Sequence, residues 1–253
     1  MKNIQLTCAH ALVKFLIVQK TLIDGKKVPL FPGVFGIFGH GNVACLGQAL
    51  QENKKDLPTW RGHHEQNMAL TGIGYARAKR RKQIFVATSS VGPGSTNMVT
   101  AAAVAMSNRI PILFLPGDTF SNRFPDPVLQ QVEHFNNPGI TANDAFKPVT
   151  RYFDRITRPE QIISSLQQAV QVMLDPADCG PACISLSQDV QGEVYDYPEE
   201  FFKERVHTIR RSRPDDFQIK EAAELIKKSK KPIIISGGGV FYSDATDQLS
   251  AFA

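Results

Sequence analysis

The sequence predicts an α/β fold: a doubly wound, mostly parallel sheet with helices on both faces, followed by the start of a second α/β domain. Three observations predict it. Four short runs are apolar throughout, as strands buried on both faces are. Amphipathic stretches of helical length separate these runs. The same alternation then begins again after a polar stretch rich in charge and proline.

The expected elements alternate along the first three quarters of the chain. Residues 5–20 carry apolar side chains at helical spacing and should form the first helix. The candidate strands are 34–38, 83–89, 110–116 and 181–187, and the candidate helices are 41–53, 64–80, 94–107 and 159–174. Together they predict one N-terminal domain over residues 1–190.

A second domain is expected to begin near the C-terminal end of the sequence. Residues 191–214 combine charge, aromatic residues and proline, which is typical of an extended linker. Residues 215–253 then predict a capped helix, a short apolar strand and a glycine turn. About 40 residues cannot close a doubly wound sheet, so we expect that this central α/β domain is either truncated here or completed by something outside this chain.

Composition excludes several classes of protein. The chain has 253 residues, 42% of them hydrophobic and 21% charged, which predicts a large core and excludes a disordered chain. The apolar runs are far shorter than the roughly 20 residues that span a bilayer, and no signal-like segment is present, so a cytoplasmic protein without membrane contact is expected.

Charge and cysteine content point to neither nucleic acid nor metal. The net charge is +5, and the basic run 76–83 is the obvious candidate for a nucleic-acid patch. The run lacks interleaved aromatic residues and lies at the end of a helix, where cations oppose the helix dipole. The four cysteines are scattered without metal-ligand spacing, so no metal ligand is assigned.

One segment places a carboxylate at the start of a helix. Glu65 falls in the first turn of the predicted helix 64–80, and Ala69, Gly72 and Ala76 share its face. Small residues on that face would let another backbone or a flat ligand come close. A carboxylate that merely caps a tightly packed helix is the alternative interpretation.

Glycine-rich turns follow two of the predicted strands. The turn at 92–94, Gly-Pro-Gly, lies between a strand and a helix, where ligands bind in open α/β sheets. The loop 38–42 carries His40 and Asn42, which are polar and could contact a substrate. Neither turn matches a phosphate-loop motif, so an ordinary strand-to-helix connection and a solvated histidine remain alternatives.

In this order and spacing, the segments resemble the N-terminal, pyrimidine-binding domain of thiamine-diphosphate enzymes of the acetohydroxyacid synthase type. The residues that carry the resemblance are His64-Glu65-Gln66, Gly72, Gly74 to Arg77, Thr88-Ser89, Gly92-Pro93-Gly94, Asn97, Gly180-Pro181 and Asp189-Val190. Residues 62–78, 91–105 and 130–156 are most similar to the branch of this family that hydrolyses a carbon–carbon bond of a cyclic dione in inositol catabolism.

The resemblance implies a role for each matched residue. Glu65 would be the catalytic residue, hydrogen-bonding the aminopyrimidine ring of thiamine diphosphate and promoting its imino form. Gly92, Pro93, Gly94 and Asn97 would bind the same side of the cofactor. Mg²⁺ and the diphosphate would be held by a C-terminal domain with a Gly-Asp-Gly motif and a later Asn-Asn pair, which this sequence lacks. The chain is therefore expected to be inactive by itself.

Substrate contacts are expected from two loops, through His40 and Asn42 in one and Phe135 and Asn136 in the other. The resemblance implies a small cyclic dione as substrate, opened to 5-deoxy-glucuronate, and a homodimer or homotetramer with active sites between subunits. Two alternatives remain. One is another thiamine-diphosphate enzyme, a carboligase or decarboxylase. The other is a non-catalytic nucleotide-binding module, using the glycine turn at 236–239, in which Glu65 only caps a helix.

Overall fold

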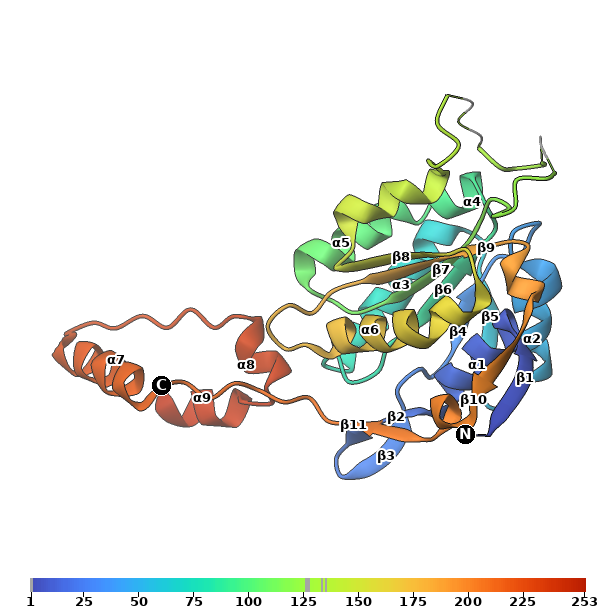
Figure 1. Ribbon diagram of the computed structural model, residues 1–253. Helices are drawn as coiled ribbons and strands as arrows, with labels where there is room; N and C mark the ends of the chain where they lie inside the picture. Colours follow the sequence, from blue (N-terminus) through green and yellow to red (C-terminus); the bar gives the residue numbers. More distant parts are fainter. Residues whose placement is uncertain (1, 126–127, 133, 135) are drawn as a thin grey trace. The chain divides into compact units, whose positions relative to one another are not determined.

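A six-stranded parallel sheet forms the centre of the first of two compact units, which extends to Thr208 (Figure 1). The computed structural model describes residues 2–125, 128–132, 134 and 136–253. The strand order is β5-β4-β6-β7-β9-β8, and every neighbouring pair is parallel. The strands are β4 (Val34–Gly36), β5 (Thr59–Arg61), β6 (Val86–Ser89), β7 (Leu113–Asp118), β8 (Tyr152–Ile156) and β9 (Ala182–Ser187). This sheet confirms the predicted fold class.

Helices cover both faces of the sheet, as expected for strands that are apolar throughout. On one face, side chains of α1, α2 and α6 form the main hydrophobic core with the strands. On the other face, α3 and α5 pack together, and α5 contacts η2. These elements are α1 (Cys8–Val18), η1 (Val43–Gly47), α2 (Gln48–Glu52), α3 (Glu65–Ala78), α4 (Pro93–Thr96), α5 (Val99–Asn108), η2 (Ala142–Val149), η3 (Pro159–Gln161) and α6 (Ile162–Leu174).

The helix predicted over residues 5–20 is shorter than expected. Residues 3–7 form β1 (Asn3–Thr7), which pairs antiparallel with β10 (Val194–Pro198). The Thr7 side chain accepts a hydrogen bond from the His10 backbone N–H, and this cap starts α1 at Cys8. Beyond α1 the chain continues as β2 (Gln19–Ile23), paired with β3 (Lys26–Pro29). Both strands depend on partners that helical spacing does not reveal.

The predicted linker 191–214 is wrong over much of its length. After η4 (Val190–Gly192) it contributes β10, η5 (Glu199–Phe202) and β11 (Arg205–His207), which pairs with β2. Tyr197 is fully buried, and its hydroxyl donates to the Pro159 carbonyl at 3.0 Å. Tyr197, an aromatic residue of the predicted extended linker, is therefore a packing residue, and the first unit runs past residue 190 to Thr208.

Residues 209–253 form the second unit, which contains α7 (Asp216–Lys228), α8 (Gly238–Tyr242) and α9 (Thr246–Phe252). The predicted cap of α7 is present, because Asp215 accepts a hydrogen bond from the Phe217 N–H at 2.7 Å. The short apolar strand predicted within residues 215–253 does not form. Ile233 and Ile235 are 88% and 93% exposed, and a strand needs a paired neighbour, which the described residues do not supply.

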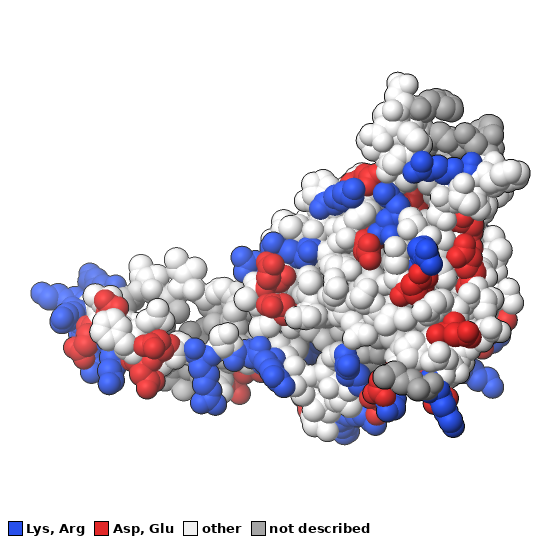
Figure 2. All heavy atoms as spheres, in the orientation of Figure 1, with Lys and Arg blue, Asp and Glu red and all other residues white. Residues whose placement is uncertain are grey.

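The surface of the first unit is mixed in charge. On the face that Figure 2 shows, Lys and Arg are interspersed with Asp and Glu and do not gather into one basic field. Among the described residues, no helix is both long and apolar enough to cross a membrane.

Candidate functional site

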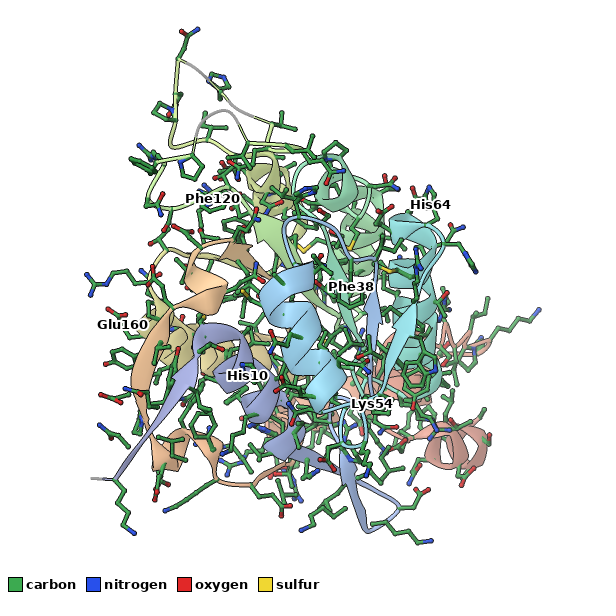
Figure 3. All side chains as sticks on the ribbon, turned by 90° about the vertical axis from the view of Figure 1, so that its right-hand side faces the viewer. His10, Phe38, Lys54, His64, Phe120 and Glu160 are labelled. Carbon is green, nitrogen blue, oxygen red and sulfur yellow. The ribbon has the colours of Figure 1, made fainter. Side chains whose placement is uncertain are left out.

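The strand order creates a topological switch between β4 and β6. These two strands are neighbours, yet the chain leaves β4 toward β5 and leaves β6 toward β7, on the opposite side. Ligands of open α/β sheets bind at the carboxyl ends of such strands. Figure 3 shows Phe38, Phe120 and His64 around this upper end of the unit, with His10 and Lys54 farther down.

Glycines let the loops after β4 and β6 pack directly on each other. The Gly41 N–H donates to Ser90 Oγ at 3.3 Å. A Cβ on Gly41 would lie 2.5 Å from the Val91 nitrogen, and one on Gly39 would lie 2.7 Å from Ser90 Oγ. Larger side chains at either glycine would separate the loops. The two glycine-rich segments that the sequence analysis selected, 38–42 and 92–94, thus belong to two loops that pack on each other.

Glu65 lies at the edge of this structure, as the first residue of α3. The Asn97 side-chain amide donates to Glu65 Oε2 at 2.7 Å, and its nitrogen is 3.4 Å from Nε2 of His64. Asn97 ends the short helix α4, which follows the Gly-Pro-Gly turn. The structure therefore brings together the carboxylate and the amide that sequence reasoning had assigned to the same site.

The second oxygen of Glu65 faces Gly94. A Cβ on Gly94 would lie 3.4 Å from Glu65 Oε1, 3.6 Å from the Ser90 Cβ and 3.8 Å from the Ser89 Cβ. Glycine thus leaves open a cradle walled by a half-buried carboxylate and two buried serines. A flat ring with a hydrogen-bond donor at its edge would fit against this wall.

A third loop reaches the turn from the far side. Gly92 has φ of +66°, and a Cβ there would lie 1.9 Å from the Gln130 carbonyl oxygen. Ser90 Oγ also donates to Gln130 Oε1 at 3.2 Å. Sequence reasoning missed both Ser90 and Gln130. Ser90 directly follows the β6 strand and could have been selected for that position, whereas no local signal marks Gln130.

The four predicted substrate residues fall in different surroundings. His40 is exposed in the loop that packs on Ser90. Asn42 is 1% exposed: its Oδ1 accepts from the Gly39 N–H at 2.9 Å, and its Nδ2 donates to Thr88 Oγ1 at 3.1 Å. The Asn42 side chain therefore holds the conformation of the loop. Asn136 is exposed, and Phe135 lies outside the described residues.

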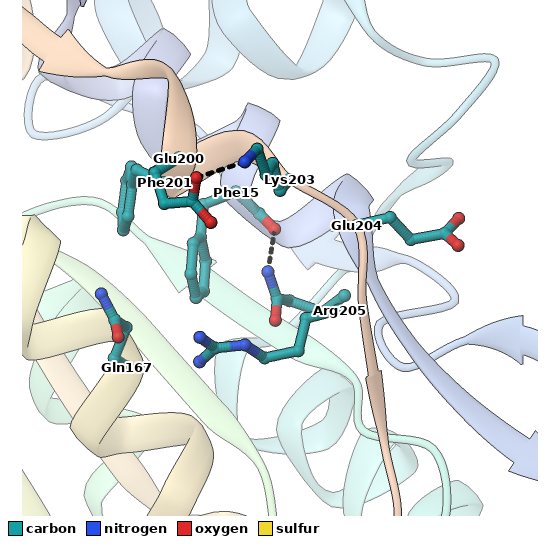
Figure 4. Close-up of a pocket in the computed structure, with 8 residues that line it drawn as sticks. Phe15, Gln167, Glu200, Phe201, Lys203, Glu204 and Arg205 are labelled. Atoms are coloured by element: carbon teal, nitrogen blue, oxygen red, sulfur yellow. Dashed lines mark hydrogen bonds and ion pairs between the residues drawn. The ribbon is translucent and has the colours of Figure 1, made fainter. Parts of the chain in front are cut away.

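A separate pocket of about 190 Å³ lies near β11, away from the switch between β4 and β6 (Figure 4). Two contacts join residues of its lining: Lys203 forms an ion pair with Glu200, and Gln19 donates to the Phe15 carbonyl at 3.0 Å. The remaining lining residues are Gln167, Phe201, Glu204 and Arg205.

The segment that carries Glu65, Asn97 and the Gly-Pro-Gly turn is similar to a known domain of thiamine pyrophosphate enzymes. Residues 32–137 match the family described as "Thiamine pyrophosphate enzyme, N-terminal TPP binding domain", and this range contains all of those residues. Residues 32–137 are therefore similar to that domain.

More specific similarity extends over the whole chain. It is 54% identical over 253 residues to the 3D-(3,5/4)-trihydroxycyclohexane-1,2-dione hydrolase of Clostridium tetani, covering 100% of this chain and 39% of the relative. It is 52% identical over 252 residues to the protein of the same name in Bacillus subtilis, covering 100% and 40%. The chain thus spans about 40% of the length of these curated relatives.

A solved structure shares the fold. The thiamine diphosphate-dependent 4-hydroxybenzoylformate decarboxylase of Rhodococcus jostii RHA1 matches with a TM-score of 0.73 at 17% identity, over 96% of this chain and 41% of that one.

Proposed function

We propose that this chain is the N-terminal part of a thiamine-diphosphate-dependent hydrolase that opens the ring of trihydroxycyclohexane-1,2-dione to 5-deoxy-glucuronate in inositol catabolism. The observation that carries the proposal is the carboxylate of Glu65, held by Asn97 and facing Gly94. The specific substrate is supported by the 54% identity to a relative named for it.

The residues of the cradle fit the aminopyrimidine ring of the cofactor. The ring is flat, and Gly94 leaves space where any other residue would place a Cβ. The ring also carries hydrogen-bonding nitrogens, and Oε1 of Glu65 faces that space. Asn97 occupies Oε2 and so fixes the plane of the carboxylate. When bound, thiamine diphosphate supplies the electron sink for carbon–carbon bond cleavage.

Glu65 would act by holding and moving one proton at its Oε1 atom. The loops after β4 and β6, packed through Gly41 and Ser90, would exclude water from one side of this proton. Gln130, resting on Gly92, would close a second side. The protein thus supplies orientation and proton transfer.

Mg²⁺ and the diphosphate would be bound by residues outside this chain. Among the described residues, no group of three or more His, Cys, Asp and Glu side chains could hold a metal ion. The relatives are about 2.5 times as long, which leaves room for a domain that does so. Residues 215–253 would open the central domain between the two.

The remaining functional assignments rest on the resemblance of the sequence. The substrate would be a small cyclic dione, and the residues proposed to contact it are His40, Phe135 and Asn136. The enzyme would be a cytoplasmic homodimer or homotetramer with active sites between subunits, and neither nucleic acid nor membrane would be a partner.

The decisive experiment compares Glu65→Gln with the unaltered full-length enzyme. Loss of the proton-holding group should lower kcat by about 10²-fold or more while the enzyme still binds the cofactor. Near-normal turnover would favour the non-catalytic module. Asn67→Ala, at an exposed residue of α3, serves as the control and should retain turnover.

A substrate panel separates the hydrolase from its nearest alternative. The unaltered enzyme should consume the cyclic dione and leave pyruvate unchanged. Decarboxylation of pyruvate without turnover of the dione would instead identify a carboligase or decarboxylase.

A further inference from the structure

We propose that Asn143 is a positioning residue for the cofactor wall: its amide ties Ser95, the neighbour of Gly94, to strands β7 and β9. It thereby fixes the distance between the Gly-Pro-Gly turn and Glu65. This inference rests on the proposed thiamine-diphosphate function and adds residues far along the chain to its cofactor site.

The turn needs an external attachment because α4 is too short to hold itself in place. The helix has four residues, and Gly92 at its N-terminus offers no side-chain cap. Pro93 and Thr96 are exposed to solvent. Ser95 alone among its four residues is fully buried, and its hydroxyl donates to Oδ1 of Asn143. The position of Gly94 therefore depends on where Asn143 is held.

Asn143 is held by two central strands. Its Nδ2 donates to the Gly117 carbonyl in β7 at 2.9 Å and to Ser185 Oγ in β9 at 2.7 Å. The side chain is buried, and all of its hydrogen-bonding groups have partners. One amide thus sets α4 in register with the rigid part of the sheet.

A buried charge pair supports the strand side of this attachment. The Ser185 hydroxyl donates to Asp118, whose side chain is 1% exposed. Arg155 Nε donates to the same carboxylate oxygen at 2.8 Å. Because the Ser185 hydrogen goes to Asp118, its oxygen is free to accept from Asn143. The donor and the acceptor are therefore fixed in each of the hydrogen bonds that link Ser95, Asn143, Ser185 and Asp118.

The same arginine closes the network on the element that carries Asn143. Arg155 Nη2 lies 3.0 Å from Asp144 Oδ1 and donates to Thr141 Oγ1 at 2.9 Å. Thr141 and Asp144 form the capping box of η2. Connected buried networks of this kind lose more than one bond when a member is removed, because the remaining groups are left unsatisfied.

The consequence is a cofactor wall whose position is set from the central strands β7 and β9. Glu65 belongs to α3, and Gly94 is held through Ser95 and Asn143. A shift of about 1 Å in one wall of a reacting site can cost about 10²-fold in rate. Loss of the Ser95 hydroxyl should displace this wall, and the first measurable effect should be a higher dissociation constant for the cofactor.

The test uses the full-length enzyme, with Ser95→Ala as the main variant. Ser165→Ala is its matched control, because Ser165 lies on α6, away from the turn, is equally buried, and accepts a hydrogen bond from the Tyr152 hydroxyl of β8. The dissociation constant of thiamine diphosphate is measured by calorimetric titration at saturating Mg²⁺. Thermal unfolding without cofactor is recorded for each variant.

The expected result is a cofactor dissociation constant raised about 10-fold or more in Ser95→Ala and unchanged in Ser165→Ala, with similar losses of thermal stability in both. Asn143→Asp should weaken binding in the same direction, and the double variant Ser95→Ala with Asn143→Asp should lose less than the sum. Ser95→Ala alone decides the case if the Asp variant does not fold.

Two outcomes would overturn the inference. One is a folded Ser95→Ala enzyme that binds thiamine diphosphate within about twofold of the unaltered protein. The other is an equal loss of affinity in Ser165→Ala, which would mean a general effect of buried hydroxyls. Failure of the unaltered enzyme to bind thiamine diphosphate would instead refute the proposed function, and this result is read from the first titration.

Discussion

The Asn97 amide nitrogen lies 2.7 Å from Oε2 of Glu65, so the residue at the C-cap of the short helix α4 holds the first residue of α3. The two oxygens of the carboxylate are thereby distinguished. Oε2 accepts a hydrogen bond from the protein, while Oε1 faces the open space at Gly94. A carboxylate held in this way keeps its plane and one acceptor directed at the cradle.

Removing the Asn97 amide should lower activity without unfolding the protein. In Asn97→Ala the carboxylate can rotate, and we expect kcat of the full-length enzyme to fall about 10-fold or more. Asn97→Asp should lose more, because two carboxylates would face each other at hydrogen-bond distance. Asn67→Ala, at an exposed asparagine of the same α3 helix, is the control. Equal activity in all three variants would show that Asn97 does not contribute to catalysis.

Filling the cradle should weaken cofactor binding. In Gly94→Ala the new methyl group would lie 3.4 Å from Glu65 Oε1, an ordinary contact that the folded protein tolerates. It would occupy the space proposed for the aminopyrimidine ring, so the dissociation constant of thiamine diphosphate should rise about 10-fold or more. The measurement is a cofactor titration of the full-length enzyme.

Gly74→Ala provides the matched control for that experiment. Gly74 lies inside α3, and nothing lies within 4 Å of its added Cβ. Alanine in a helix interior is favoured over glycine by about 1 kcal/mol, so this variant should be as stable as the original or more so, with unchanged cofactor affinity. Unaltered binding in Gly94→Ala would contradict the cradle.

Gly92→Ala should displace the loop that rests on the turn. Its Cβ would lie 1.9 Å from the Gln130 carbonyl oxygen, and its φ of +66° is unfavourable for alanine. Gly25→Ala has a similar φ of +75° with nothing within 4 Å, so it reports the conformational strain alone, about 1–2 kcal/mol. Gly92→Ala should lose more stability than Gly25→Ala in urea unfolding and should be cleaved faster by protease near Gln130. Equal losses would show that the loop does not depend on the turn.

The sequence predicted those parts of the molecule that are determined locally. The central strands β6, β7 and β9 are mostly apolar and buried throughout, and Glu65, Gly94 and Asn97 belong to motifs of adjacent residues. Strands β1 and β10 could not be predicted in the same way, because each is short and pairs across nearly the whole first unit. The parallel pairing of β2 and β11 is equally distant in sequence.

The residues of the site could likewise be predicted only where they belong to a local sequence motif. Ser90, Gln130 and Asn143 acquire their importance from contacts between segments about 40 to 50 residues apart, which no local spacing records. Asn42 shows the reverse case. Its place in a glycine-rich loop suggested a ligand contact, whereas its amide is spent on the loop backbone and Thr88.

Lowering the pH should weaken the attachment of β11 to β2, because His207 would become protonated. Burial lowers the pKa of this histidine, and the nearby charge of Arg205 lowers it further, so the folded state favours the neutral ring. Nε2 of that ring lies 2.9 Å from Oε1 of Gln19 in β2. A lowered pKa means that the stability from this group is complete above the ordinary value of 6.5 and is lost as the pH falls through the lowered value.

The free energy of unfolding of the 253-residue chain should therefore decrease as the pH falls from about 7 to about 5, and His207→Gln should remove part of that decrease. Trp60, the single tryptophan of the chain, lies in β5 and reports on the first unit by fluorescence. His63→Gln, at an exposed histidine, should leave the slope unchanged. Identical pH dependence in His207→Gln and the unaltered chain would show that β11 is not held through this ring.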